Sequence, residues 1–85
     1  MSFVHSQVQT NAGDVIEVSL RGNAANVLVM SSSDFHSYQR RGRCNYYGGY
    51  YTRSPAIIRP PSGQWHVVVE PPRGRVSASI RVLRG

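Results

Sequence analysis

The sequence predicts an all-β domain, an antiparallel β-sandwich of about seven short strands. Val outnumbers Leu by eleven to three, and β-branched residues favour strands over helices. Short apolar segments also alternate with polar residues, as they do in strands that bury one face. Clusters of Gly, Pro, Asn and Ser interrupt these segments roughly every 8 to 12 residues, a spacing typical of sandwiches and barrels.

Three strands are predicted in the first third of the chain. Residues 15–20 show the clearest alternation, with Ile16, Val18 and Leu20 on the face that we expect to be buried. The intervening turns contain Asn and Gly, which adopt turn conformations easily. The predicted strands are residues 3–8, 15–20 and 26–30, and the predicted turns are residues 11–14 and 21–24.

One short helical segment is predicted at residues 34–40. The serines and Asp34 that precede Phe35 are good N-cap residues, and Gly42 is suited to end a helix. Phe35 and Tyr38 are three residues apart, so they share one face of this helix.

The segment Tyr46-Tyr-Gly-Gly-Tyr-Tyr51 predicts a β-hairpin. Two glycines between β-favouring pairs can form a tight turn with positive φ angles. Such a turn places Tyr47 opposite Tyr50 and Tyr46 opposite Tyr51, on the two sides of the ribbon. We expect one of these pairs to be exposed.

The last third of the chain supplies the remaining strands. Trp65 shares a strand face with Val67 and Val69, so we interpret it as a core anchor in preference to the alternative, a ligand platform. Prolines at residues 59–63 and 71–74 indicate loops, because proline cannot sit in a central strand. The predicted strands are residues 56–58, 65–70 and 75–83, the last with Val76, Ala78, Ile80 and Val82 inward.

The length of 85 residues predicts one domain, residues 1–85. The single cysteine, Cys44, cannot form an internal disulfide, which excludes a disulfide-stapled secreted mini-protein. The sequence contains neither a signal-peptide pattern nor a membrane span. We therefore expect a cytoplasmic protein that does not act at a membrane.

Several motifs occur in an order that resembles a small bacterial family known only as a conserved domain of unknown function. The likeness covers nearly the whole chain and is most specific in Tyr46-Tyr-Gly-Gly49, Ser54-Pro55 and Gly63-x-Trp65. The resemblance implies an all-β domain that occurs alone or attached to other modules, such as TIR-type signalling domains. It implies no established catalytic residues.

The positive charge is concentrated in residues 36–59. The net charge is +6, all ten cations are Arg, and five of them lie in this segment with all five Tyr. No Asp or Glu occurs between Asp34 and Glu70. Arg forks interleaved with aromatic rings suit a surface that holds phosphates and stacks bases. The alternatives are that the Tyr residues only pack the sandwich and that codon bias explains the Arg excess.

We therefore predict a non-catalytic binding or sensory module for an anionic partner, such as a nucleotide, a nucleic acid or another phosphorylated or acidic molecule. The alternative is an interaction domain that assembles with itself or docks on a signalling protein through its Tyr-rich hairpin. The residues predicted to bind the anionic ligand are Arg40, Arg41, Arg43, Tyr46, Tyr47, Tyr50, Tyr51 and Arg53.

The sequence offers little support for catalysis or metal binding. Cys44 follows Arg43, a setting that favours a thiolate where the thiol is exposed, and His36 and His66 are candidate bases. No spacing specifies a nucleophile and base. His5, the other two His and Cys44 lack the close spacing of metal ligands. We expect no enzymatic activity, no cofactor and no metal.

Overall fold

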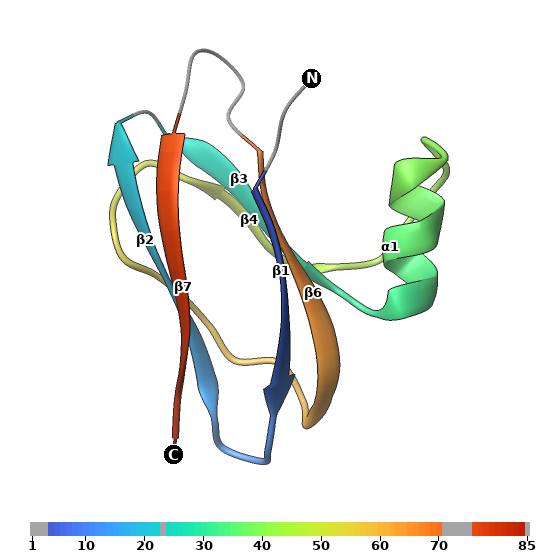
Figure 1. Cartoon of the computed structure of the whole chain (residues 1–85), viewed down its shortest axis with the longest axis horizontal. Coiled ribbons are helices and arrows are strands. Elements are labelled where there is room, and N and C mark those ends of the chain that lie inside the picture. Colours follow the sequence, from blue (N-terminus) through green and yellow to red (C-terminus); the bar gives the residue numbers. More distant parts are fainter. Residues whose placement is uncertain (1–3, 23, 71–75, 85) are drawn as a thin grey trace.

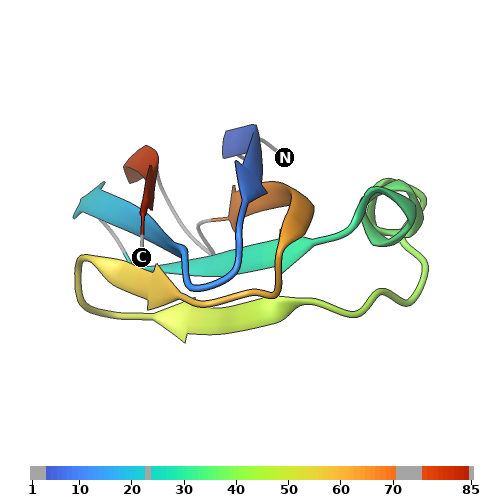
Figure 2. The same ribbon diagram turned by 90° about the horizontal axis from the view of Figure 1, so that it is seen from below.

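The computed structural model describes residues 4–22, 24–70 and 76–84. Two antiparallel sheets stack on each other, and one helix stands beside the larger sheet (Figures 1 and 2). The strand order is β1-β6-β3-β4 in the larger sheet and β5-β2-β7 in the smaller one. The elements are β1 (Val4–Thr10), β2 (Val15–Gly22), β3 (Ala25–Met30), α1 (Ser32–Gln39), β4 (Tyr47–Tyr51), β5 (Ala56–Ile58), β6 (Gly63–Glu70) and β7 (Val76–Leu83). The predicted fold class, seven strands with one short helix, is confirmed.

The main core lies between the two sheets. Alternate residues of each strand point inward, which removes a continuous layer of branched side chains from water. Each such side chain contributes about 1.5–3 kcal/mol when it is fully buried. The fully buried members of this layer include Ile16, Val18, Val27, Val29, Val67 and Val69. Trp65 packs against the same layer and its Nε1 donates to the Pro61 carbonyl at 2.9 Å, so its prediction as a core anchor is confirmed.

The predicted turn at residues 11–14 is confirmed, and the predicted turn at residues 21–24 is wrong for its first two residues. Residues 11–14 turn as predicted, with the Asp14 amide donating to the Asn11 carbonyl at 3.0 Å. Arg21 and Gly22, predicted to turn, instead continue β2 because they pair with Ser77 and Val76 of β7. The predicted turn at residues 71–74, together with Phe3 and Arg75 at predicted strand ends, lies outside the described residues.

Helix α1 begins two residues before the predicted segment. Ser31 is its N-cap, and the Asp34 amide donates to the Ser31 hydroxyl. At the other end Arg41 adopts a left-handed φ of 59°, and the Gly42 amide donates to the Ser37 carbonyl at 2.8 Å. This is a Schellman ending in which Arg41 occupies the position that glycine usually takes. Within the described part of the chain, no helix is long and apolar enough to cross a membrane.

The predicted hairpin at Tyr46–Tyr51 is wrong. Gly48 and Gly49 lie inside β4, which pairs with β3 along its whole length. Pairing with β3 satisfies the backbone groups that a local hairpin would otherwise satisfy. Gly48 has a φ of 115°, and a Cβ atom there would lie 2.1 Å from the Val27 carbonyl oxygen. The glycine therefore permits a close approach between two strands, where the sequence pattern predicted a turn.

Candidate functional site

The outer face of the larger sheet carries a second apolar cluster beneath α1. Leu28 and Met30 of β3, Val68 of β6 and Phe35 of α1 form it, all buried. Tyr38 and Cys44 pack against this cluster. Phe35 and Tyr38 share one face of α1 as predicted, with ring centroids 6.3 Å apart. Phe35 and Tyr38 thus attach α1 to the larger sheet.

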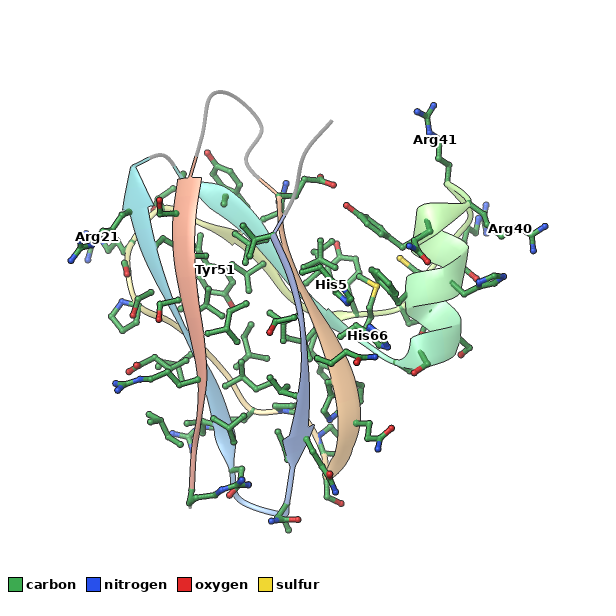
Figure 3. The ribbon with its side chains drawn as sticks, in the orientation of Figure 1. His5, Arg21, Arg40, Arg41, Tyr51 and His66 are labelled. Carbon is green, nitrogen blue, oxygen red and sulfur yellow. The ribbon has the colours of Figure 1, made fainter. Side chains whose placement is uncertain are left out.

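Two histidines that are 61 positions apart in the sequence meet at this cluster. His5 of β1 and His66 of β6 have nearly parallel rings, and His5 Nε2 lies 2.8 Å from His66 Nδ1. The Phe35 ring stacks on both, with centroids 4.2 Å from His5 and 4.5 Å from His66. Figure 3 shows His5 and His66 on the side of the larger sheet that faces α1. The Phe35 ring covers one side of the histidine pair, so these two polar rings lie against apolar surroundings.

His66 is the buried member of this pair, with only 7% of its surface exposed. Its Nε2 atom lies 3.1 Å from the Ser32 hydroxyl and 3.4 Å from the Gln7 side-chain nitrogen. Burial, and to a smaller extent the charge of His5, lower the pKa of His66 below its ordinary value. The imidazole of His66 is therefore neutral at neutral pH.

A pocket of about 260 Å³ lies beside His66 at the start of α1. Its lining comes from β1, from β6 and from the first residue of the helix. The lining residues are Gln7, Val8, Gln9, Ser32, Gln64, Trp65 and His66. Among these described residues no side chain carries a permanent charge, so the pocket suits an uncharged polar group better than an ion.

A second, partly buried polar contact anchors the middle of α1. The Tyr38 hydroxyl donates to the Glu70 carboxylate at the end of β6. Burial, with added contributions from the Glu70 hydrogen bond and charge, raises the pKa of Tyr38 well above its ordinary value. Tyr38 therefore stays protonated and acts as a structural donor.

Three of the predicted ligand residues lie together at the end of α1. Arg40, Arg41 and Arg43, here called the α1 arginine cluster, are all exposed and fall within four positions. Arg40 approaches the His36 ring, with its Nη1 3.4 Å from Nε2. Cations near a helix C-terminus also interact favourably with the helix dipole, which is a structural role open to Arg40.

The predicted tyrosines do not form one surface. The register pairs Tyr47 with Val29 and Tyr51 with Ala25, so both point to the inner side, while Tyr50 pairs with Asn26 on the outer side. Tyr51 is half-buried against the main core, and Tyr46, Tyr47 and Tyr50 are exposed. The predicted pairing of Tyr47 with Tyr50 and of Tyr46 with Tyr51 is therefore wrong, because no hairpin brings them together.

Tyr46 and Tyr47 line a separate pocket of about 240 Å³. This pocket also contains Trp65, whose ring meets Tyr47 edge-on at 5.5 Å, and the side chain of Asp34. A carboxylate beside these two tyrosines disfavours an anion there. The α1 arginine cluster is thus a positively charged surface, whereas Tyr46 and Tyr47 lie beside a carboxylate.

Tyr50, Tyr51 and Arg53 lie at or beyond the far end of β4. Figure 3 shows Tyr51 on the side of the molecule that carries Arg21, whereas Arg40 and Arg41 project from the opposite end. The longest dimension of the molecule is 35 Å. The structure therefore brings Arg40, Arg41 and Arg43 together and separates them from Arg53 and the last tyrosines.

The four Asp and Glu side chains interact with groups other than Arg40, Arg41 and Arg43. Arg84 approaches Asp14 at 2.7 Å and Arg81 approaches Glu17 at 2.7 Å. Asp34 accepts from the Ser31 hydroxyl and the Asn45 amide, and Glu70 accepts from Tyr38. Within the described residues, the positive charge of the cluster is not neutralised by an ion pair.

Sequence reasoning missed the meeting of Ser32, His5 and His66. The sequence suggested His66 as a base for Cys44 or as a metal ligand, whereas Cys44 packs against the second cluster. His5 and His66 are 61 positions apart and meet only because β1 pairs with β6, which no local pattern encodes. In residues 4–22, 24–70 and 76–84, no three His, Cys, Asp or Glu side chains gather as metal ligands.

Comparisons with known proteins place the chain in a family without assigning it an activity. Neither the curated proteins nor the solved structures contain a match. The family model described as domain of unknown function (DUF1883) matches residues 1–84. The match spans both sheets and α1, in agreement with the resemblance carried by the tyrosine, proline and tryptophan motifs. The chain therefore belongs to the DUF1883 family.

Proposed function

We propose that this domain is a binding module for an anionic partner and that the α1 arginine cluster is its contact surface. The observation that carries the proposal is the presence of three exposed arginines within four positions, none in an ion pair within the described residues. Guanidinium groups bind phosphate oxygens through paired hydrogen bonds. A phosphate-bearing ligand, such as a nucleic acid or a nucleotide, matches this chemistry.

The proposed contact surface is smaller than the ligand-binding surface predicted from the sequence. Tyr46 and Tyr47 share their pocket with Asp34, and Tyr50, Tyr51 and Arg53 belong to the other end of β4. Binding therefore depends on phosphate contacts more than on base stacking, and sequence preference is weak. We also propose that the protein is cytoplasmic. Nucleotides and nucleic acids are abundant there, and a lone thiol such as Cys44 stays reduced.

The test is the salt dependence of binding to a fluorescent oligothymidylate, followed by anisotropy. Each arginine that contacts a phosphate contributes roughly 0.7 to the slope of log K against log salt. Arg40→Ala and Arg43→Ala should each weaken binding and lower the slope by about that amount. Arg53→Ala is the matched control, because Arg53 is also exposed but lies beyond the far end of β4.

Two results contradict the proposal. One is the absence of binding at low salt to the oligonucleotide and to nucleotides in a thermal-shift screen, since a ligand that binds the native state raises its stability. The other is an equal effect of Arg53→Ala, which would mean that net charge alone attracts the probe.

A second candidate function is self-assembly through β4. This strand is an edge of the larger sheet, and Tyr46, Tyr47 and Tyr50 beside it are 45–57% exposed. An edge strand with exposed aromatic side chains can pair with the same strand of a second copy. Sedimentation equilibrium of the wild type and of Tyr50→Lys tests this. A monomer at high concentration contradicts it.

A further inference from the structure

Ser32, His66 and His5 form a continuous hydrogen-bonded chain across α1, β6 and β1. The Ser32 Oγ lies 3.1 Å from His66 Nε2, and His66 Nδ1 lies 2.8 Å from His5 Nε2. A hydroxyl, an imidazole and a third group that orients the imidazole are the three parts of an activated serine nucleophile. The chain is distinct from the α1 arginine cluster, which lies at the other end of the helix.

The surroundings of His66 determine which ring nitrogen carries its proton. The Gln7 amide nitrogen, 3.4 Å from Nε2, can only donate, whereas the Ser32 hydroxyl beside the same atom can donate or accept. Nε2 must therefore be the acceptor, so the proton is on Nδ1 and is donated to His5 Nε2. In this tautomer the free electron pair of His66 points at the hydroxyl of Ser32, as a general base requires.

The burial of His66 supports its role as a general base. Phe35 of α1 stacks on its ring, and Met30 lies opposite it on β3. His5 is the titratable group in contact with His66, and the facing residues Ser32, Phe35 and Met30 carry no charge. Burial lowers the pKa of His66, so the base is already unprotonated at neutral pH.

The pocket of about 260 Å³ gives a substrate access to Ser32, which is exposed. Gln9 and Gln64 also line it, and their side-chain amides can donate to a carbonyl oxygen that becomes negatively charged. Because these described lining groups are uncharged at neutral pH, they favour a small neutral ester over an ionic substrate.

We infer that this pocket is an acyl-transfer site for small uncharged esters, with Ser32 as nucleophile, His66 as general base and His5 as a positioning residue. Ser32 Oγ forms a bond to the carbonyl carbon while His66 Nε2 takes the hydroxyl proton. The bond to the alcohol then breaks, and His66 returns the proton to the leaving oxygen. Water attacks the acyl-serine, and His66 passes the proton of that water to Ser32, which releases the acid.

The first test is covalent labelling of the folded protein by a serine-reactive fluorophosphonate, measured by intact mass and peptide mapping. We expect one adduct, on Ser32, and no adduct in Ser32→Ala. Ser33→Ala is the matched control, because Ser33 is the next exposed serine on the same helical turn and should label like the wild type. The inference is overturned if no adduct forms, or if Ser32→Ala is labelled as fast as the wild type.

The second test separates positioning from folding. His5→Ala removes the acceptor of the His66 proton, and we expect labelling and hydrolysis of p-nitrophenyl acetate to slow by about 100-fold. His5→Gln, which keeps an acceptor oxygen, should restore most of the rate. The wild-type rate should rise from acidic pH to a plateau reached below pH 7. Equal rates for His5→Ala and the wild type would contradict the role of His5. Oligonucleotide binding should be unchanged in these variants, so failure here leaves the anion-binding proposal standing.

Discussion

The two faces of the larger sheet are built from the same strands but are stabilised differently. The inner face presents branched apolar side chains, among them Val27, Val29, Val67 and Val69, that need only to be packed. The outer face interleaves Met30 and Val68 with His66, which tolerates burial only because His5, Ser32 and Gln7 satisfy its ring nitrogens. The inner face therefore depends on packing alone, whereas the stability of the outer face also depends on the protonation state and hydrogen bonds of His66.

The largest effect is expected where β4 closes on the edge of β3. Gly48→Ala should lower the free energy of unfolding by about 4 kcal/mol or more, or prevent folding. The added carbon would lie 2.1 Å from the Val27 carbonyl oxygen, and backbone cannot yield as a flexible side chain can. Denaturant unfolding followed by the fluorescence of Trp65 measures the loss.

Gly49→Ala is the control for this prediction. A Cβ atom at Gly49 meets nothing within 4 Å, so this variant should lose clearly less stability than Gly48→Ala. Equal losses would mean that the backbone conformation matters and the close approach to β3 does not.

The next largest effect tests whether the two faces are separable. Phe35→Ala should cost about 3 kcal/mol, because Phe35 is the aromatic cover of the outer cluster and stacks on both histidines. Helical circular dichroism should fall while amide protection in β2 and β7 persists, since these strands pack only in the inner layer. Val67→Ala, an inner-face control, should weaken protection in both sheets. Loss of all protection in Phe35→Ala would contradict the separation.

A smaller effect follows from the lowered pKa of His66. Its ordinary pKa is 6.5, so just below pH 6.5 the unfolded chain binds a proton that the folded chain does not. The free energy of unfolding should therefore fall as the pH drops from 6.5 towards the folded-state pKa, and should not change on this account above pH 6.5. His66→Gln should reduce the slope of stability against pH in that window. An unchanged slope would show that His66 is not the group responsible.

The sequence predicted the inner face well and the outer face poorly, for a physical reason. Alternation alone identified Ile16, Val18 and Val67 as core residues, because burial of one strand face is a local property of the sequence. The pairing of β1 with β6 is not local, so the meeting of His5 and His66 could not be predicted. Gly48 misled the prediction because a positive φ serves a turn and a close approach equally well. Arg40 and Arg53 are likewise separated because residues 47–51 form one extended strand and not a hairpin.

The smallest effect concerns the end of α1, where Arg41 occupies a position that glycine prefers. A side chain at a left-handed φ of 59° costs roughly 1 kcal/mol relative to glycine. Arg41→Gly should therefore raise the free energy of unfolding by about 0.5–1 kcal/mol while it weakens binding of the oligonucleotide. A gain in stability with a loss of binding would show that Arg41 is better suited to a ligand than to the helix. A loss of stability would instead assign Arg41 to the helix dipole, and unchanged binding would remove it from the proposed anion site.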